Sequence, residues 1–311
     1  MAPSFAEELH VRSAYRKVTL TLCRRLHTRP FTFIIGEDET LVYEHGGIIS
    51  ALSAPLDRLI NGPMGEGQSG IVIFPELEVG DFERICEFAY RGDYKPPAPT
   101  RFLDTEVDIG NDMWLLDGAL QAASPAVNDS GIPAERQRER ERDREDELYQ
   151  EVVPLSGTTR KEYFEGIDCP GTGNTQAEII QSFSAHGNRS WRENFAPVLL
   201  GHSRLYAFAE QYLIPELKQL AFAKLKLTLT QYTPFVSSLD TVNQLAQFAY
   251  DKVYIQNRAE GRVDPLRQLV VAFIVMHHGH FRDSTVHREL MESAGEYATD
   301  VLDLIGRWFD Y

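Results

Sequence analysis

The chain lacks several features that mark other classes of protein. No stretch approaches 18 consecutive apolar residues, so no membrane-spanning helix is predicted. The first residues lack the apolar core that a secretory signal requires. Only three cysteines occur, far apart and without a C-x-x-C pair, which excludes a Cys-based zinc site and fits a reducing compartment. We therefore expect a cytoplasmic or nuclear protein that does not contact a membrane.

Positive charge is scarce as well. The chain has 31 Lys and Arg residues against 46 Asp and Glu residues, a net charge of −15. Because nucleic-acid binding needs clustered basic side chains for the phosphates, no nucleic acid is expected as a partner. Residues 1–30 carry six basic residues against two acidic ones, whereas residues 31–96 carry four against twelve. A mildly basic N-terminal arm, compatible with a helix, thus precedes an acidic segment.

Patterns for catalysis and for cofactor binding are also missing. His277-His278-x-His280 invites a metal interpretation, but adjacent imidazoles on a helix point about 100° apart and no further ligand completes the set. Gly171-x-Gly173 lacks the strand, helix and Lys of a phosphate-binding loop. No Ser/His/Asp or Cys/His arrangement has a supporting context. We expect no enzymatic activity, no cofactor, no metal and no small-molecule substrate.

The segment 31–74 predicts a small sheet. Apolar residues alternate with others over 31–35, a polar turn follows at 36–39, and an apolar stretch resumes at 41–43, a pattern typical of a β-hairpin. A short helix is predicted near Pro55, because proline fits the first turn, and Asn61-Gly62-Pro63 is expected to end it. Ile71-Val-Ile-Phe74 predicts a buried third strand.

An amphipathic helix is predicted next. Asp81 is the candidate N-cap and Gly92 the candidate terminating residue. The residues between them place an apolar stripe at helical spacing, formed by Phe82, Ile85, Cys86, Ala89 and Tyr90.

Residues 97–196 differ from their surroundings. They contain proline- and glycine-rich stretches and a run of Arg and Glu at 134–147 with almost no apolar residue. Because such a segment buries too little apolar surface to offset the loss of chain entropy, most of it is predicted to be disordered. We expect that removal of residues 100–190 leaves the fold intact.

Helical patterns resume at Pro197 and continue to the end of the chain. Apolar stripes predict a helical hairpin over 197–228, and further helices are predicted over 229–311. Within that last segment, Thr241-x-x-Gln244 is similar to a capping box, and Asp264-Pro265 predicts a second helix start.

The order of these elements resembles the BTB/POZ domain. The resemblance rests on the strand–strand–helix–strand–helix order of 31–94 and on a Leu-Tyr-x-x-Ala-x-x-Tyr pattern at 205–212. The helices that follow resemble a BACK-like tail, as in the short BTB proteins of filamentous fungi. The resemblance implies an α+β fold in which a small sheet is clasped by helices. The BTB core would be discontinuous, with 31–96 and 197–228 separated by the insert and followed by a helical extension.

The resemblance also implies a function in protein–protein interaction. Met64-Gly65-Glu66 matches the hydrophobic-x-Glu motif of BTB adaptors that bind cullin scaffolds, and Tyr90 is the third candidate partner-binding residue. His45 and Gly92 match positions typical of the family, with a capping or hydrogen-bonding role for His45. The chain would dimerise and recruit partners, including a cullin-type ubiquitin ligase. Two alternatives remain open: an oligomerisation scaffold, and a transcriptional cofactor, which the absence of a zinc finger or basic domain disfavours.

Self-association would use the start of the domain. BTB interfaces bury an N-terminal helix and the first strand, where this chain has Leu22, Leu26, Phe31 and Phe33. Many BTB domains carry an Asp just before the first strand, but Arg29-Pro30 stands here, so a dimer-stabilising charge pair through that Asp is in doubt.

Overall fold

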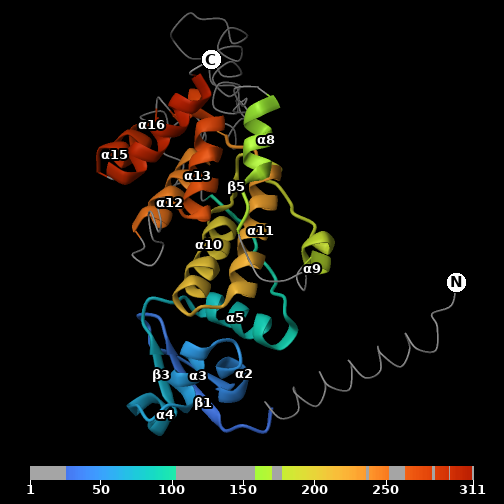
Figure 1. The fold of residues 1–311 in the computed structure, drawn as a ribbon, viewed down its shortest axis with the longest axis vertical. Helices are drawn as coiled ribbons and strands as arrows, with labels where there is room; N and C mark the ends of the chain where they lie inside the picture. Colours follow the sequence, from blue (N-terminus) through green and yellow to red (C-terminus); the bar gives the residue numbers. More distant parts are fainter. Residues whose placement is uncertain are drawn as a thin grey trace, which may run out of the picture. The chain divides into compact units, whose positions relative to one another are not determined.

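The computed structural model describes residues 26–102, 158–169, 177–235, 238–251, 263–281, 284–293 and 295–309. Within these ranges the chain has an α+β fold with many helices and a small sheet (Figure 1). Two compact units are present. The first contains Met1–Pro97, Cys169–Ser184 and Gly201–Lys224, and the second contains Ala98–Asp168, Ala185–Leu200 and Leu225–Tyr311. No helix among the described residues is both long enough and apolar enough to cross a membrane.

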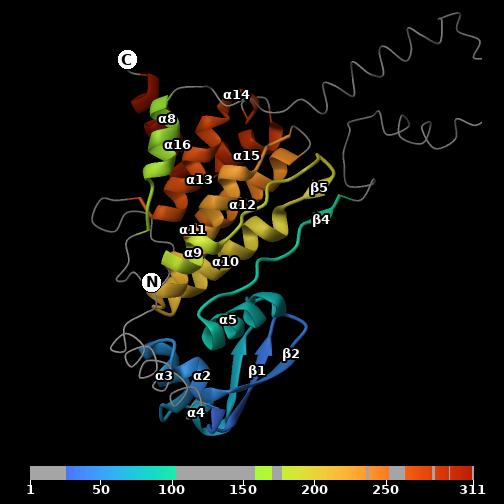
Figure 2. The same ribbon diagram turned by 90° about the vertical axis from the view of Figure 1, so that its right-hand side faces the viewer.

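The sheet of the first unit has three strands. Strand β1 (Pro30–Ile35) pairs antiparallel with β2 (Thr40–His45) and parallel with β3 (Ile71–Phe74), so the order is β2-β1-β3. Figure 2 shows β1 and β2 side by side. The predicted hairpin and third strand are confirmed. The chain turns between the first two strands at Gly36, whose φ of 75° favours a residue without a Cβ.

The two faces of this sheet differ in exposure, because successive side chains of a strand point to opposite sides. Phe31 and Phe33 lie on the buried face, with exposed fractions of 2% and 0%. These two side chains thus pack inside the first unit, and their predicted role in a dimer interface stays a prediction. Leu26 is exposed, and Leu22 lies outside the described residues. The opposite face carries exposed apolar side chains: Leu41, Tyr43, Ile71 and Ile73.

Short helices connect the strands. Helix α2 (Gly46–Ser50) follows β2 directly, and α3 (Ala54–Asn61) begins after Ser53, whose hydroxyl accepts a hydrogen bond from the Leu56 N–H. The predicted end of that helix at Asn61-Gly62 is confirmed. The glycine-rich connection to β3 contains an additional helix, α4 (Gly65–Ser69), which the sequence pattern did not predict.

Helix α5 (Val79–Arg91) starts earlier than predicted. Its N-cap is Glu78, and Asp81 lies in the first turn with its side chain fully buried. Asp81 is therefore not the cap; its carboxylate binds arginine side chains instead. The predicted end is confirmed, because Gly92 adopts a φ of 73° and its N–H donates to the Phe88 carbonyl.

The core of the first unit joins residues that are distant in the sequence. The rings of Phe33 and Phe82 lie 4.9 Å apart between sheet and α5. The Phe74 ring makes edge contacts with Phe208 at 5.9 Å and Tyr212 at 5.8 Å. Phe208 belongs to helix α10 (Ala196–Gln211), and Tyr212 directly follows this helix; α11 (Pro215–Gln231) comes next. Residues beyond position 200 thus complete the hydrophobic core around the sheet.

Helix α13 (Pro265–Met276) lies at the centre of the second unit and is almost entirely buried. It contacts α8 (Thr158–Gly166), α12 (Leu239–Asp251) and α16 (Gly295–Phe309), and α14 (His278–Phe281) and α15 (Thr285–Ser293) follow it in the chain (Figures 1 and 2). The predicted cap is confirmed, because the Asp264 carboxylate accepts from the Leu266 N–H at 2.8 Å. Thr241 lies inside α12 rather than before it, so the predicted capping box does not start this helix.

Part of the predicted insert is ordered and packed. Helix α8 and helix α9 (Ala177–Ser182) lie within it, and β4 (Thr100–Arg101) pairs with β5 (Glu193–Asn194). Phe164 is 3% exposed, and its ring lies 6.3 Å from that of Phe273. The removal of residues 100–190 would therefore also remove packed side chains, and its effect on the fold stays a prediction. The Arg- and Glu-rich run 134–147 lies outside the described residues.

Candidate protein-interaction site

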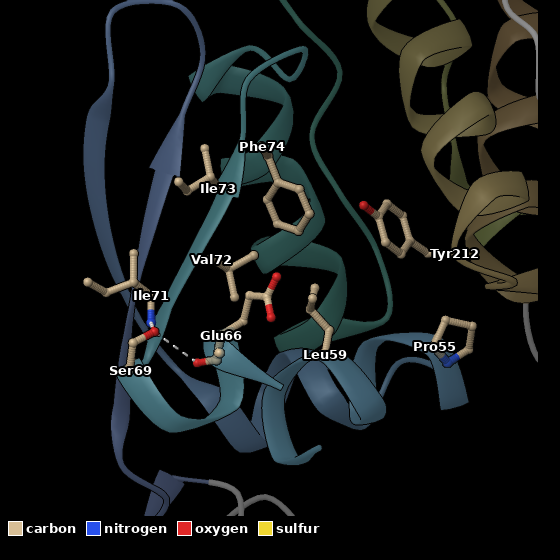
Figure 3. A pocket seen from close by; sticks show the side chains of 10 residues that line it. Pro55, Leu59, Glu66, Ser69, Ile71, Val72, Ile73, Phe74 and Tyr212 are labelled. Carbon is tan, nitrogen blue, oxygen red and sulfur yellow. Dashed lines mark hydrogen bonds between the residues drawn. The ribbon is translucent and has the colours of Figure 1, made fainter. Parts of the chain in front are cut away.

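A hollow of about 680 Å³ lies beside β3 in the first unit (Figure 3). Helix α3, helix α4, strand β3 and the residue after α10 all contribute to its walls. The lining residues are Pro55, Leu59, Gly65, Glu66, Ser69, Ile71, Val72, Ile73, Phe74 and Tyr212. The hollow is thus mainly apolar, with a few polar groups, as is common for binding sites.

Local sequence features place β3 along this hollow. Gly70 adopts a φ of 75°, which lets the chain turn from α4 into the strand, and its N–H donates to the Glu66 carbonyl. The alternation of the strand then buries Val72 and Phe74 while exposing Ile73, which remains 61% accessible. Because β3 ends the strand order, the hollow follows an edge of the sheet.

The charge of this hollow is negative. Glu66 is half-buried, and its side chain points between Val72 and Leu59 in Figure 3. No Lys or Arg occurs among the lining residues. On the opposite wall, burial and the nearby Glu76 carboxylate raise the pKa of the Tyr212 hydroxyl, so that this group stays neutral and can donate a hydrogen bond.

Two of the three predicted partner-binding residues lie at this site. Met64 immediately precedes α4 and is 67% exposed, although it does not line the hollow itself. Glu66 lies in the first turn of α4 and lines the hollow. Together they place an exposed apolar side chain next to a carboxylate.

Tyr90 does not belong to this arrangement. Its hydroxyl donates to the Glu44 carboxylate at 2.7 Å and lies 3.2 Å from Nδ1 of His45. Burial and the Glu44 contact raise the pKa of this hydroxyl. Glu44 and His45 are in β2, on the other side of β1 from the hollow. His45 makes no side-chain capping bond to α2, so its described role is the contact with Tyr90.

Tyr212 is the residue that sequence analysis missed. Its place in the apolar stripe of 199–212 predicts a core residue, and nothing in that pattern indicates that its ring contacts Phe74 beside the hollow. The two residues are far apart in the sequence, and local periodicity carries no information about such a pairing.

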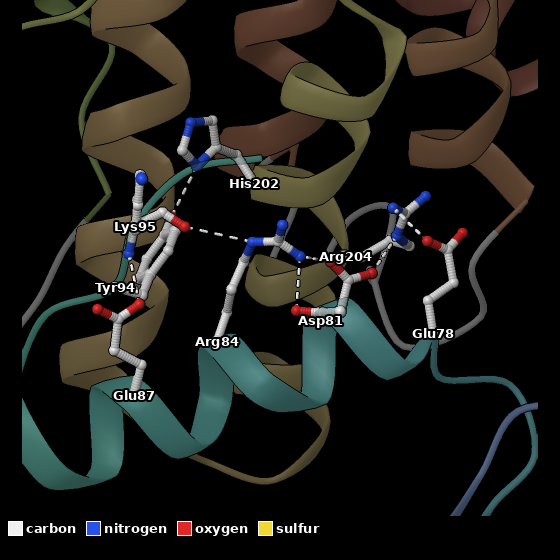
Figure 4. Close-up of polar contacts among 9 residues, drawn as sticks. Glu78, Asp81, Arg84, Glu87, Tyr94, Lys95, His202 and Arg204 are labelled. Atoms are coloured by element: carbon white, nitrogen blue, oxygen red, sulfur yellow. Dashed lines mark hydrogen bonds and ion pairs between the residues drawn. The ribbon is translucent and has the colours of Figure 1, made fainter. Parts of the chain in front are cut away.

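A second polar cluster in the same unit is buried and structural (Figure 4). The Asp81 carboxylate, 0% exposed, pairs with Arg84 at 3.3 Å and with Nε of Arg204; Arg204 also pairs with Glu78 at 2.9 Å. The pKa of Asp81 is nevertheless raised, because the loss of hydration outweighs the attraction of Arg204. The charged form of the Asp81 carboxylate is therefore stabilised mainly by its arginine partners.

Tyr94, His202 and Lys224 form the other half of this cluster. The Tyr94 hydroxyl lies 2.7 Å from Nδ1 of His202, and the Lys224 ammonium donates to Asp93 and to the Tyr94 carbonyl. Burial, with Lys224 and Arg84 nearby, lowers the pKa of His202 to about 3, so the imidazole is neutral. Because His202 is fully buried, it cannot reach a substrate. Its contacts instead connect residues 93–94 to residues 202–224.

The described ranges contain no group of three or more His, Cys, Asp or Glu side chains placed to hold a metal ion. The side chains of Cys86 and Cys169 are buried. Burial, with Glu44 and Glu83 nearby, raises the pKa of Cys86, which makes this thiol unreactive.

No protein-family model matches this chain, and a comparison with curated proteins finds no significant match.

Proposed function

We propose that the first unit is a protein-interaction module of the BTB/POZ type, which recruits a protein partner through Met64, Glu66 and the hollow beside β3. One observation carries the proposal: an exposed methionine stands two residues before a half-buried carboxylate that lines a mainly apolar hollow. The α+β element order of 30–91 also supports it.

The partner that suits the motif is a cullin-type scaffold. An apolar anchor beside a single charge matches the anatomy of protein interfaces, in which a desolvated centre is surrounded by a polar rim. The chain would then serve as a substrate adaptor of a ubiquitin ligase. The two acidic groups near the hollow, Glu66 and Glu76, favour a basic patch on the scaffold.

Calorimetry with the purified N-terminal domain of a cullin tests this proposal. Met64→Ala should weaken binding by about 1–3 kcal/mol, within the usual range for an anchor residue. Glu66→Lys should slow association and reverse its dependence on salt. Leu302→Ala is the matched control, because Leu302 is a similarly exposed apolar residue of the second unit and should leave binding unchanged. If the wild-type protein does not bind the domain, the cullin role is refuted.

A self-associating scaffold is the second candidate. The outer face of the sheet favours it, since Leu41 and Tyr43 occupy alternate positions of one strand and are both exposed on this face. Light scattering at micromolar concentrations should then show a dimer that Tyr43→Ser converts to a monomer. A monomeric wild-type protein would contradict this alternative and leave partner recruitment as the better account.

A further inference from the structure

Strand β3 has one paired edge and one open edge. The Thr32 N–H donates to the Gly70 carbonyl at 2.8 Å, and the Gly36 N–H donates to the Phe74 carbonyl at 3.0 Å. In a parallel ladder the bonding residues alternate, so Val72 and Phe74 direct their backbone groups towards β1. Ile73 therefore directs both its N–H and its carbonyl away from β1.

The open edge has backbone groups that can pair with another strand. At its start, the Ile71 N–H donates to the Ser69 hydroxyl at 3.2 Å, while the Ile71 carbonyl points outwards. The edge thus offers two carbonyls and the Ile73 N–H to an incoming backbone. These groups are sufficient for a short strand addition, the mode in which main-chain bonds give affinity and side-chain pockets give specificity.

The side chains of this edge give no protection against strand pairing, and its short length of four residues is the only protective feature within the strand. Proteins protect edge strands with charged side chains, prolines or bulges, or cover them with another element. The sequence Ile71-Val72-Ile73-Phe74 has no charge and no proline within it. Ile71 and Ile73 are 41% and 61% exposed. An exposed apolar edge of this kind is an aggregation hazard unless a partner covers it.

The hollow lies along the same edge. In Figure 3, Leu59 and Tyr212 lie on the side of β3 away from β1. An added strand would alternate its side chains between two surroundings. One set would lie next to the exposed Ile71 and Ile73 side chains, and the other would enter the hollow between Leu59 and Tyr212. Both sets would therefore meet apolar surface.

The negative charge of the hollow favours a bound segment with a basic side chain. Glu66 lines it without any Lys or Arg among its neighbours in the lining. We propose that the open edge of β3 binds an extended segment of a partner protein as a fourth strand, with alternating apolar side chains and one Lys or Arg that pairs with Glu66. The inference rests on the proposed function for the location of the site, and it adds the conformation and charge of the bound segment.

A second copy of the chain fits this edge poorly. Two copies joined edge to edge by a twofold axis would bring the two Glu66 side chains, and the acidic surroundings of both hollows, towards each other. Residues 31–96 carry twelve acidic residues against four basic ones. Like charges at such short range oppose association, so a basic partner segment is favoured.

A designed peptide tests the inference with the full-length protein. The probe is a fluorescein-labelled nonapeptide, Lys-Thr-Val-Leu-Val-Lys-Val-Leu-Thr, whose valines lie on one face and whose second lysine, at the sixth position, lies on the other. Fluorescence anisotropy should show saturable binding. A peptide with Glu at the sixth position, and one N-methylated at alternate amides, should each fail to bind, because the first repels Glu66 and the second cannot donate to the strand edge.

Variants of the protein locate the contact. Ile73→Pro removes the outward N–H without touching the ladder to β1, so it should weaken peptide binding about tenfold. Ile73→Thr is the matched control, since it keeps the N–H and the branched side chain, and should bind nearly as the wild type does. Glu66→Gln should weaken binding about threefold to tenfold and abolish its salt dependence. Thermal unfolding checks that each variant is folded.

The outcomes separate this inference from the proposed function. The strand inference is overturned if the probe does not bind, if the N-methylated peptide binds equally well, or if Ile73→Pro has no effect. A dimer that Ile73→Pro dissociates would also overturn it, in favour of a second copy. If the cullin domain binds through Met64 while the probe does not bind, the proposed function stands alone. If the probe binds but the cullin domain does not, the cullin role fails and the strand inference stands.

Discussion

Replacing Arg204 by Met should destabilise the first unit and make its stability depend strongly on pH. The substitution leaves the fully buried Asp81 carboxylate with Arg84, at 3.3 Å, as its remaining ion-pair partner. Removing one partner of a buried pair costs about 3–5 kcal/mol, because the other charge stays buried without compensation. We expect a value near the lower limit, about 3 kcal/mol, since Arg84 still neutralises part of the charge.

The sign of the pH dependence follows from the raised pKa of Asp81. A carboxyl group whose pKa is higher in the folded state contributes stability below its unfolded pKa, and this contribution is lost as the pH rises through the folded pKa. Arg204 lowers the pKa of Asp81, so its removal raises that pKa further and extends the loss to higher pH. The destabilisation by Arg204→Met should therefore be largest at neutral pH and should shrink towards about pH 4, where Asp81 is protonated.

Urea unfolding followed by circular dichroism measures this effect across the pH range. Asp81→Asn is the control, because a neutral amide should show little pH dependence at this position. The double variant Asp81→Asn/Arg204→Met should lose less stability than the sum of the two single changes. Additive effects, or a loss of stability that is the same at acidic and neutral pH, would show that the pair does not hold this unit together.

Three further changes test other parts of the structure. Phe164→Ala should destabilise the second unit by about 3–5 kcal/mol in thermal unfolding, since this ring is buried against Phe273, and a change near zero would support the idea of a dispensable insert. Gly92→Ala should lose about 1 kcal/mol in chemical denaturation because of its φ of 73°, whereas Gly279→Ala, on a residue without positive φ, should be close to neutral. His202→Gln should reduce the loss of stability on acidification: the pKa of His202 is lowered to about 3 when folded, so its contribution is complete above an unfolded pKa of about 6.5 and is lost as the pH falls towards 3. An unchanged acid titration of stability in that variant would show that His202 does not stay neutral.

Features determined by neighbouring residues were predictable from the sequence. The strands of the hairpin follow from alternation, and the ends of three helices follow from Ser53, Gly92 and Asp264. Each of these residues acts on backbone groups only a few positions away. Interactions between neighbouring residues thus determine these helix termini, and tertiary contacts do not change them.

Asp81 shows where local chemistry fails. An Asp before an apolar helical stripe is a good capping residue, yet its carboxylate binds Arg204, 123 residues later in the sequence. The need of the fully buried Asp81 carboxylate for a counter-charge outweighs the roughly 1 kcal/mol that a cap provides. The helix extends back to Val79 as a result.

The buried face of the sheet could not be predicted from the sequence, for a different reason. The alternating pattern correctly predicts that Phe31 and Phe33 lie on the same face of the sheet. The opposite face also has apolar residues, such as Ile34 and Tyr43. When a strand has apolar side chains on both faces, its sequence does not indicate which face is buried. Contacts with α5 make the choice, and these form only in the folded unit. For the candidate site, the motif located Met64 and Glu66, while Tyr212 and the open edge of β3 are products of tertiary structure.

Between Pro97 and Gly201 the chain leaves the first unit for about a hundred residues, of which only Cys169–Ser184 belong to that unit. The excursion begins and ends at residues in close contact, since a Cβ on Gly201 would lie 2.5 Å from Cγ of Pro97. Closing a free loop of that length costs about 4 kcal/mol of chain entropy. The excursion is not a free loop, however, because β4 at Thr100–Arg101 pairs with β5 at Glu193–Asn194. The β4–β5 ladder holds the two ends of the excursion together only a few residues beyond Pro97 and before Gly201. The folding of the second unit therefore offsets most of the entropy lost on loop closure. The stability of the first unit should therefore depend on the second unit through chain closure.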